Sequence, residues 1–205
     1  MRIALVGATG GTGQEILKQS LTAGYTVTVL VREPTKIAVQ DQQLTIVEGN
    51  VLDQSAVDRV VTGADAVVVA LGNTANNPEM VVSTGTERII DAMRRQGVRR
   101  LVVISSLGVG DSKRQVPFGF KLLSWTILRK TMKDKEAQEA AVRESGLDWT
   151  IIRPGGLTDD PRTGNYRVGT DSSIQAGRIA RADVADFVLR ELEQNAYVGM
   201  TPAIT

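Results

Sequence analysis

Three glycines spaced three residues apart, Gly7, Gly10 and Gly13, form the part of this sequence best suited to binding a phosphorylated ligand. They follow a strand-like run at residues 3–6 and open a helix-like stretch. Gly7 allows a tight turn, Gly10 lets the backbone approach a pyrophosphate, and Gly13 permits close packing of the helix on the strand. Amides at the helix start then face the negative ligand. The residues expected to contact a dinucleotide here are Gly7, Thr9, Gly10, Gly11, Thr12 and Gly13. The alternative is a plain strand-to-helix connection.

The end of the second strand-like run indicates which dinucleotide binds. An acidic residue there would accept hydrogen bonds from the ribose 2′-hydroxyl, whereas an arginine would meet the 2′-phosphate of NADPH. Arg32 occupies this position, and Lys36 either adds a second charge or is simply solvated. Glu33 could reach the ribose hydroxyls and allow NADH as well. We therefore predict NADPH (NADP+) as the favoured cofactor.

Residues that follow the later strands are expected to line the rest of the cleft, because the carboxyl ends of parallel strands meet at one edge. In chain order the candidates are Asn50, Val51, Leu71, Gly72, Asn73, Ser105, Ser106, Pro154, Gly155, Gly156 and Leu157. The Ser106 hydroxyl could bond the nicotinamide carboxamide or a substrate oxygen. The amides of Gly155 and Gly156 could approach the nicotinamide face. Ordinary turn and loop roles remain the alternative for each residue.

The composition excludes several classes of chemistry. The chain has no cysteine and no histidine, so disulfides, thiolate nucleophiles, imidazole bases and the usual zinc ligand sets are absent, and we expect no metal site. A net charge of +1 gives no global attraction for nucleic acid or an anionic membrane. No run approaches the roughly 20 apolar residues of a membrane span. Because the N-terminus enters a strand directly, without a signal-peptide pattern, we expect a cytoplasmic protein.

Strand-like and helix-like stretches alternate along the chain. Continuous apolar, β-branched runs, typical of strands buried on both faces, occupy residues 3–6, 27–31, 44–47, 66–70, 101–104 and 150–152. Helices are expected over residues 13–23, 55–61, 83–96, 132–145 and 182–192, several of them closed by Gly24, Gly97 or Gly146. The pattern predicts an α/β protein, one doubly wound Rossmann domain over residues 1–205, with strand order 3-2-1-4-5-6 and helices on both faces of a parallel sheet. Loops at residues 111–120 and 158–173 would build a substrate cleft.

Motifs along nearly the whole chain carry a family resemblance. They are the glycine turn, Val31-Arg32-Glu33, Gly49-Asn50-Val51-Leu52, Ser105-Ser106, Arg143-Glu144-Ser145-Gly146-Leu147 and Arg153-Pro154-Gly155-Gly156. On these the sequence resembles the atypical short-chain dehydrogenases/reductases, the NmrA-like NAD(P)-binding family, and within it the biliverdin IXβ reductases, which are also flavin reductases. The family often has Asp in place of Asn50, and its mammalian members have Pro and His in place of Gly155 and Gly156, so the mammalian substrate preference is not implied.

The resemblance implies an NADPH-dependent oxidoreductase that passes hydride to flavins (FMN, riboflavin) or to linear tetrapyrroles of the biliverdin IXβ type. Flavin would then be a substrate rather than a tightly bound cofactor, and the small-molecule partner a planar acceptor. The resemblance places Arg32 and Lys36 on the 2′-phosphate and Ser106 beside the nicotinamide. It also suggests a monomer.

Ser106 and Lys135 are the candidate catalytic residues. Ordinary short-chain dehydrogenases pair a Tyr with a Lys four residues later, which lowers the pKa of the phenol. Lys135 matches that Lys, but Thr131 stands at the Tyr position, and only Tyr166 is expected near a cleft. Lys135 either orients a substrate or cofactor oxygen or is a solvated lysine on a charged helix. An acceptor that takes its proton from water therefore fits best.

Two other functions stay open. A non-catalytic NADP(H)-binding redox sensor or assembly factor, acting through a protein partner, would also lack the Tyr. A sugar-nucleotide epimerase or dehydratase is less favoured, because such enzymes need the Tyr–Lys pair and a larger C-terminal domain. Basic residues surround an apolar run at 118–128. This stretch could form a lid for a flat ligand, it could pack in the core with its charges in water, or it could bind a protein partner.

Overall fold

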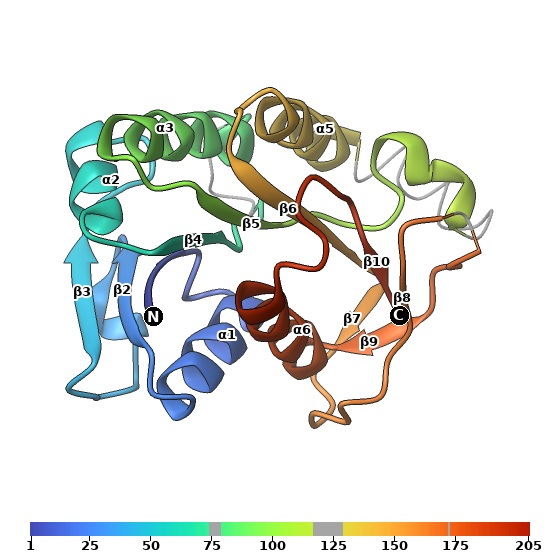
Figure 1. Ribbon diagram of the computed structural model, residues 1–205, viewed down its shortest axis with the longest axis horizontal. Coiled ribbons are helices and arrows are strands. Elements are labelled where there is room, and N and C mark those ends of the chain that lie inside the picture. The colour runs from blue at the N-terminus through green and yellow to red at the C-terminus, as the bar shows by residue number, and fades with distance from the viewer. Residues whose placement is uncertain (74–78, 117–128, 172) are drawn as a thin grey trace.

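A mostly parallel sheet forms the centre of the molecule (Figure 1). The computed structural model describes residues 1–73, 79–116, 129–171 and 173–205. In spatial order the main sheet contains β3 (Leu44–Glu48), β2 (Thr26–Val31), β1 (Arg2–Val6), β4 (Ala66–Val69), β5 (Arg100–Ile104), β6 (Asp148–Pro154), β10 (Ala203–Ile204) and β8 (Val168–Gly169). The predicted order 3-2-1-4-5-6 is confirmed. Beyond β6, the sequence did not predict β10, which is parallel to β6, or β8, which is antiparallel to β10.

Helices cover both faces of this sheet, as predicted. They are α1 (Gly11–Thr22), α2 (Gln54–Val61), α3 (Val81–Gln96), α5 (Arg129–Arg143) and α6 (Arg181–Gln194), with short 3-10 helices η1 (Pro34–Lys36) and η2 (Gly110–Gln115). In Figure 1, α2, α3 and α5 lie on one side of the sheet, and α1 and α6 on the other. A small separate sheet pairs β7 (Gly156–Thr158) with β9 (Arg178–Ala180) in parallel. The loop expected at residues 158–173 contains β8, and the one expected at 111–120 includes most of η2, with residues 117–120 outside the described part of the chain. The apolar run at 118–128 also lies outside the described residues.

The apolar core follows from the strand composition. All four residues of β4 are buried, because helices pack on both faces of this central strand. Ile89 of α3 belongs to the core layer on one face, and Ile16 of α1 with Phe187 of α6 to the layer on the other. Ile46, on the edge strand β3, remains 39% exposed. The continuous apolar runs therefore correctly indicated strands buried on both faces in the centre of the sheet.

The ends of three helices use glycine as the sequence predicted. Gly24, Gly97 and Gly146 follow α1, α3 and the last turn of α5 and adopt φ values of +79°, +71° and +67°. A left-handed conformation is strained for residues with a β-carbon, which explains glycine at these ends. Among the described residues, no helix is long and apolar enough to cross a membrane.

Candidate cofactor site

The glycine turn lies between the carboxyl end of β1 and the start of α1. Gly7 has φ +97°, and a β-carbon there would lie 2.5 Å from the carbonyl oxygen of Ala70, just beyond β4. A β-carbon on Gly13 would lie 2.0 Å from the oxygen of Gly7. The turn can therefore approach β4, and α1 can pack on the turn, only with glycine at both positions.

The amino end of α1 is suited to an anion. Gly10 caps the helix without a side-chain hydrogen bond, and the first turn contains no acidic residue. The first amides of a helix lack partners within the helix, and the helix dipole makes this end positive. A phosphate group placed here would accept hydrogen bonds from these amides and be attracted by the positive end of the dipole.

One arginine that the sequence did not single out lies beside this turn. A β-carbon on Gly11 would lie 2.8 Å from Cδ and from Nε of Arg181, the first residue of α6. Arg181 pairs with Asp159 at 2.6 Å between Nη1 and Oδ1. Nothing in the spacing of Gly11 and Arg181, which are separated by most of the chain, predicts this contact.

At the ends of β2 and β3 the predicted residues lie on the surface. Arg32 directly follows β2 and is exposed. Lys36 lies in η1, where its Nζ is 2.8 Å from Glu33 Oε1, and the ammonium lowers the pKa of Glu33. Asn50 is exposed and accepts a hydrogen bond from the amide of Leu52 at 3.0 Å. The Asn50 side-chain oxygen thus stabilises a local turn, while Arg32 and Lys36 present cations beside the site.

Lys135 links the carboxyl ends of β4 and β5. Its Nζ donates to the carbonyl oxygen of Ile104 at 2.6 Å, to that of Leu71 at 3.0 Å and to Gln138 Oε1 at 3.1 Å. Burial lowers the pKa of Lys135 to about 8, although the nearby carboxylates of Asp134 and Glu139 oppose the shift. The expectation of a solvated lysine is wrong, because the residue is only 7% exposed.

The other inward-facing polar residues of α5 are also bonded to neighbouring elements. Asp134 accepts hydrogen bonds from the amides of Ser83 at 2.8 Å and of Val82 at 3.1 Å, and so caps the start of α3 from a different helix. Asp134 also accepts from Asn73 Nδ2 at 3.0 Å, and this fixes the side chain of a predicted cleft residue. The inner face of α5 therefore sets the positions of strand ends and of a helix start around the cleft.

Glu139 anchors the end of β6. Its carboxylate pairs with Arg153 Nη2 at 2.6 Å and accepts from Ser105 Oγ at 2.6 Å. Arg153 Nη2 also pairs with Asp111 of η2 at 2.6 Å. The Ser105 hydroxyl therefore bonds to Glu139, and a contact of Ser105 with the cofactor stays a prediction.

Ser106 and the glycines after β6 differ in what they offer a ligand. Ser106 is half-buried after β5, with its hydroxyl 3.2 Å from the carbonyl oxygen of Leu107. The amide of Gly155 donates to Ile204 at 2.9 Å, and that of Gly156 donates to Gly177 at 2.8 Å. Backbone pairing therefore occupies both N–H groups, and the approach of these two peptides to the nicotinamide face stays a prediction.

None of the three tyrosines lies in the arrangement that an ordinary short-chain dehydrogenase needs. Tyr166 donates to Asp186 Oδ2 of α6 at 2.7 Å, and burial together with this carboxylate raises its pKa. The hydroxyl of Tyr25 bonds Glu193, which raises its pKa to about 12. Tyr197 packs on Phe187 in the core layer under α6. Thr131, four residues before Lys135, supplies no phenol.

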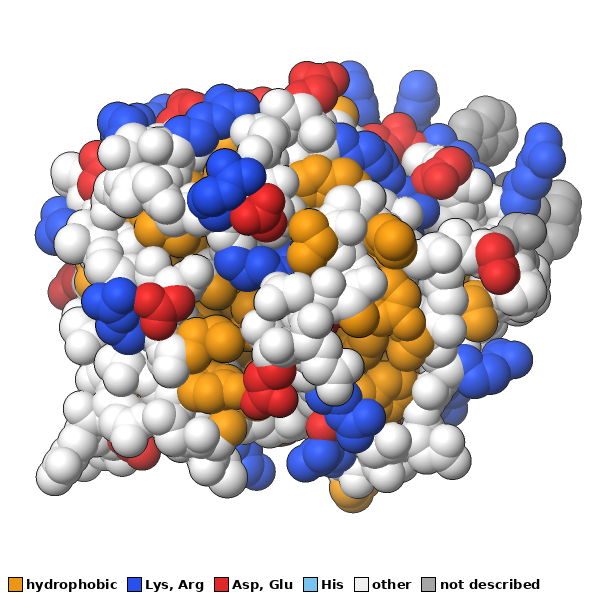
Figure 2. Space-filling model, viewed as in Figure 1, with side chains coloured by type: hydrophobic (Ala, Val, Ile, Leu, Met, Phe, Trp, Pro, Cys, Tyr) orange, Lys and Arg blue, Asp and Glu red, His pale blue; other side chains and the backbone are white. Residues whose placement is uncertain are grey.

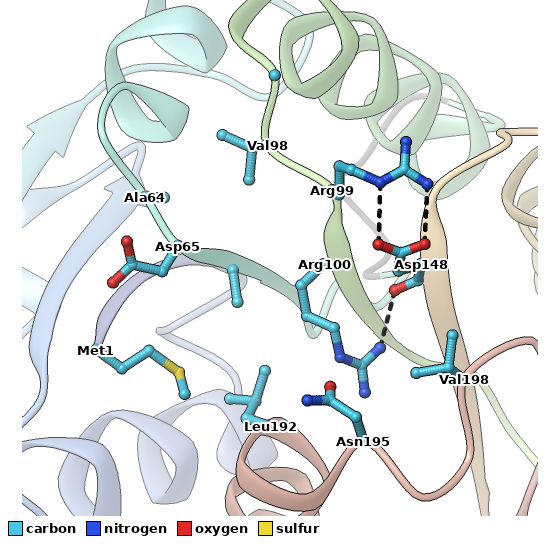
Figure 3. Close-up of a pocket in the computed structure, with 12 residues that line it drawn as sticks. Met1, Ala64, Asp65, Val98, Arg99, Arg100, Asp148, Leu192, Asn195 and Val198 are labelled. Atoms are coloured by element: carbon cyan, nitrogen blue, oxygen red, sulfur yellow. Dashed lines mark hydrogen bonds and ion pairs between the residues drawn. The ribbon is translucent and has the colours of Figure 1, made fainter.

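A separate hollow of about 700 Å³ lies at the other end of the strands, away from the glycine turn. Figure 3 shows Met1, Leu192 and Asn195 around it, with Arg99 paired to Asp148 at 2.9 Å. Figure 2 shows apolar side chains gathered over the middle of one face of the molecule, among basic and acidic ones. Because Arg100 and Asp148 begin β5 and β6, the hollow lies at the amino ends of the strands and is not the predicted cofactor cleft.

The strand order, the glycine turn and the anion-suited start of α1 define a nucleotide-binding protein of the Rossmann type. The chain belongs to the NAD(P)H-binding family, whose sequence pattern matches residues 7–195. The membership supports an NAD(P)-dependent protein of the oxidoreductase type, the cofactor class predicted from the glycines.

Named relatives have diverse roles. An uncharacterised chloroplast protein of Arabidopsis thaliana is 32% identical over 202 residues, which cover 94% of this chain and 72% of the relative. A (4-alkanoyl-5-oxo-2,5-dihydrofuran-3-yl)methyl phosphate reductase of Streptomyces griseus is 32% identical over 152 residues, covering 74% of this chain and 46% of the relative. The photosystem II assembly factor Ycf39 of Synechocystis is 27% identical, with 98% of this chain and 61% of the relative covered.

Solved structures share the fold over essentially the whole chain. The oxidoreductase ylbE of Lactococcus lactis has a TM-score of 0.86 at 22% identity, covering 100% of this chain and 90% of that one. ChuY, an anaerobillin reductase of Escherichia coli O157:H7, has a TM-score of 0.85 at 24% identity, with coverages of 100% and 96%. A wide-type short-chain dehydrogenase/reductase of Veillonella parvula, in complex with NADP, has a TM-score of 0.79 at 20% identity, with coverages of 99% and 93%. These likenesses establish the fold.

Proposed function

We propose that this protein is an NADPH-dependent reductase that transfers hydride to a planar conjugated acceptor, either a flavin such as FMN or riboflavin or a linear tetrapyrrole. The observation that carries the proposal is the state of Lys135. Its ammonium is buried and donates to two backbone carbonyls and to Gln138, so it has no donor to spare for a substrate oxygen. Thr131 replaces the phenol that would otherwise protonate a substrate.

Such a site favours an acceptor that needs no protein acid. When bound, NADPH supplies the hydride, and a reduced flavin or tetrapyrrole then collects its proton from water. The chain contributes by holding the reactants close, which is itself a large part of catalysis. The half-buried Ser106 hydroxyl at the end of β5 is the side chain best placed to orient the nicotinamide carboxamide or an acceptor oxygen.

Preference for NADPH is supported by the charges at the end of β2. Arg32 follows the strand directly, and Lys36 lies one turn further in η1. The carboxylate of Glu33 is paired with Lys36, so Glu33 is less available to accept from ribose hydroxyls. The NADP-bound fold relative from Veillonella parvula is in keeping with this choice.

The tetrapyrrole and flavin acceptors are supported by the resemblance to biliverdin IXβ reductases and by the reductase activities of two comparison proteins. ChuY is an anaerobillin reductase, and the Streptomyces griseus relative is also a reductase. Both are consistent with reduction of a conjugated small molecule here.

A second candidate is a non-catalytic NADP(H)-binding protein that acts through a protein partner. The same lack of a Tyr–Lys pair favours it, and the assembly factor Ycf39 is a relative over 98% of this chain. Binding of NADPH would then alter affinity for a partner instead of supporting turnover.

Acceptor-dependent oxidation of NADPH separates the two candidates. The purified protein would be assayed with FMN, riboflavin and a mixture of biliverdin isomers, with NADH in parallel. Turnover that requires an acceptor and favours NADPH is the expected result. Tight NADPH binding without turnover on any of these acceptors would contradict the reductase proposal and favour the partner-binding alternative.

A further inference from the structure

Two helices begin side by side at the glycine turn. Arg181 is the first residue of α6 and Gly11 is the first residue of α1. The two helices pack together on the same face of the sheet (Figure 1), and Gln19 Nε2 of α1 donates to the carbonyl oxygen of Ala182 at 2.8 Å. The stem of Arg181 crosses Gly11 so closely that any side chain at position 11 would displace it. The guanidinium is thereby held next to the phosphate-binding turn.

The position of this cation is electrostatically unfavourable without an anion. Neither α1 nor α6 has a side-chain hydrogen bond at its amino end, and both ends carry positive dipole charge. Asp183 lies in the first turn of α6, but its carboxylate accepts from the amides of Thr163 and Gly164, each at 2.8 Å, and from the Thr163 hydroxyl. The Asp183 carboxylate therefore bonds to the loop before β8.

Asp159 is the anion that Arg181 meets in this structure. The two are 2.6 Å apart, and the side chain of Asp159 is 89% exposed, whereas that of Arg181 is 27% exposed. An exposed carboxylate paired with an arginine contributes little to stability, because water competes with the pair. A phosphate held between the guanidinium and the two helix starts would make stronger, charge-assisted hydrogen bonds.

We propose that Arg181 is a pyrophosphate-binding residue of the cofactor site, and that Asp159 holds it in place until the dinucleotide replaces that contact. The inference deepens the proposed function and rests on its cofactor, but not on the acceptor. Because Arg181 lies against the turn after β1, whereas Arg32 follows β2, it contacts the part of the dinucleotide that NADPH and NADH share. Arg181 therefore contributes affinity without discriminating between the two.

The test compares dissociation constants for NADPH and NADH, measured by calorimetry or by nicotinamide fluorescence, in the wild type and three variants. In Arg181→Gln both constants should rise by about the same factor, on the order of tenfold, or about 1.4 kcal/mol. Asp159→Asn should bind both dinucleotides at least as tightly as the wild type, since a competing carboxylate is removed. Arg190→Gln, further along α6 and paired with Asp186, is the matched control and should bind normally.

Thermal unfolding of each variant separates binding from a structural role. If Arg181 only fastens the loop after β7 to α6, Arg181→Gln and Asp159→Asn should lower Tm together and leave both dissociation constants unchanged, which would overturn the inference. If Arg181→Gln weakened the binding of NADPH alone, the inference would also be overturned, because the contact would then be to the 2′-phosphate. If the wild type bound neither dinucleotide, both the proposed cofactor and the role of Arg181 would be wrong. Normal binding without acceptor turnover would refute the reductase alone.

Discussion

The Nζ of Lys135 lies 2.6 Å from the carbonyl oxygen of Ile104, the last residue of β5. The same nitrogen reaches Leu71, beyond the end of β4, so one ammonium joins two strand ends at the edge of the sheet where the cofactor is expected. This geometry makes Lys135 a positioning residue for the cleft. It also leaves proton donation to water or to a group of the acceptor itself.

Replacing Lys135 with Met should reduce stability more than catalysis. Two carbonyls and Gln138 would lose a donor in a buried region, which costs about 1–3 kcal/mol for each unsatisfied group. We expect the free energy of unfolding in urea to fall by about 3 kcal/mol, while the maximal rate with flavin changes less than about tenfold. Lys133→Met, at an exposed position of the same helix, should change stability by less than about 0.5 kcal/mol. A loss of several hundredfold in rate at unchanged stability would make Lys135 catalytic.

Lys135 also predicts a pH dependence of stability. Burial lowers its pKa in the folded protein to about 8, from the ordinary lysine value of 10.5 that it regains when the chain unfolds. Between these two pH values the unfolded chain binds more protons than the folded one, so raising the pH favours the folded state. The stability of the wild type relative to Lys135→Met should therefore increase across this window, by at most about 1.4 kcal/mol per pH unit. A stability difference that stays constant across the window would contradict the lowered pKa.

Arg32 should decide the preference between dinucleotides. Arg32→Ala removes the cation directly after β2, so the dissociation constant of NADPH should rise on the order of tenfold, or about 1.4 kcal/mol, and that of NADH much less. Lys36→Ala should have a smaller effect, because Glu33 already pairs with this ammonium. Arg59→Ala on α2 provides a control arginine outside the predicted site. Equal losses for both dinucleotides in Arg32→Ala would exclude a contact to the 2′-phosphate.

Two glycines of the predicted site should respond differently to a methyl group. In Gly13→Ala the new β-carbon would lie 2.0 Å from the oxygen of Gly7, so the turn must shift, and we expect a loss of about 2–4 kcal/mol in unfolding free energy. In Gly72→Ala the β-carbon meets nothing within 4 Å, and φ lies outside the left-handed region, so stability should be unchanged. Thermal unfolding of both variants checks the contrast. Similar Tm values would show that α1 does not need glycine to pack on the turn.

The sequence predicted the fold from patterns that are local. Continuous β-branched runs and helix-closing glycines identified the strands through β6 and the helices between them. The sequence did not predict β10, because Ala203 and Ile204 are too short a run to show periodicity. Their pairing with β6 also depends on a chain reversal after α6. The glycine turn was predicted because backbone sterics alone demand glycine at Gly7 and Gly13.

The surroundings of the turn were harder to predict because they depend on contacts between distant residues. Asp134, Lys135 and Glu139 have the composition of a solvated helix face, yet all three are buried. Apart from Gln138 and Arg143 on α5 itself, their partners lie on α3, β5 and β6 or just beyond the ends of β4 and β5, and no local pattern reveals those contacts. Arg181 was overlooked for the same reason, since Gly11 is close to it only in the folded chain.

Isotope labelling of NADPH measures whether this protein transfers hydride to an acceptor. The protein would be mixed without oxygen with FMN or biliverdin and with NADPH carrying deuterium at the position that leaves as hydride. We expect acceptor-dependent oxidation of NADPH, slowed by the label, with one NADP+ formed for each acceptor reduced by two electrons. NADPH that binds tightly but is not oxidised in the presence of either acceptor would contradict it.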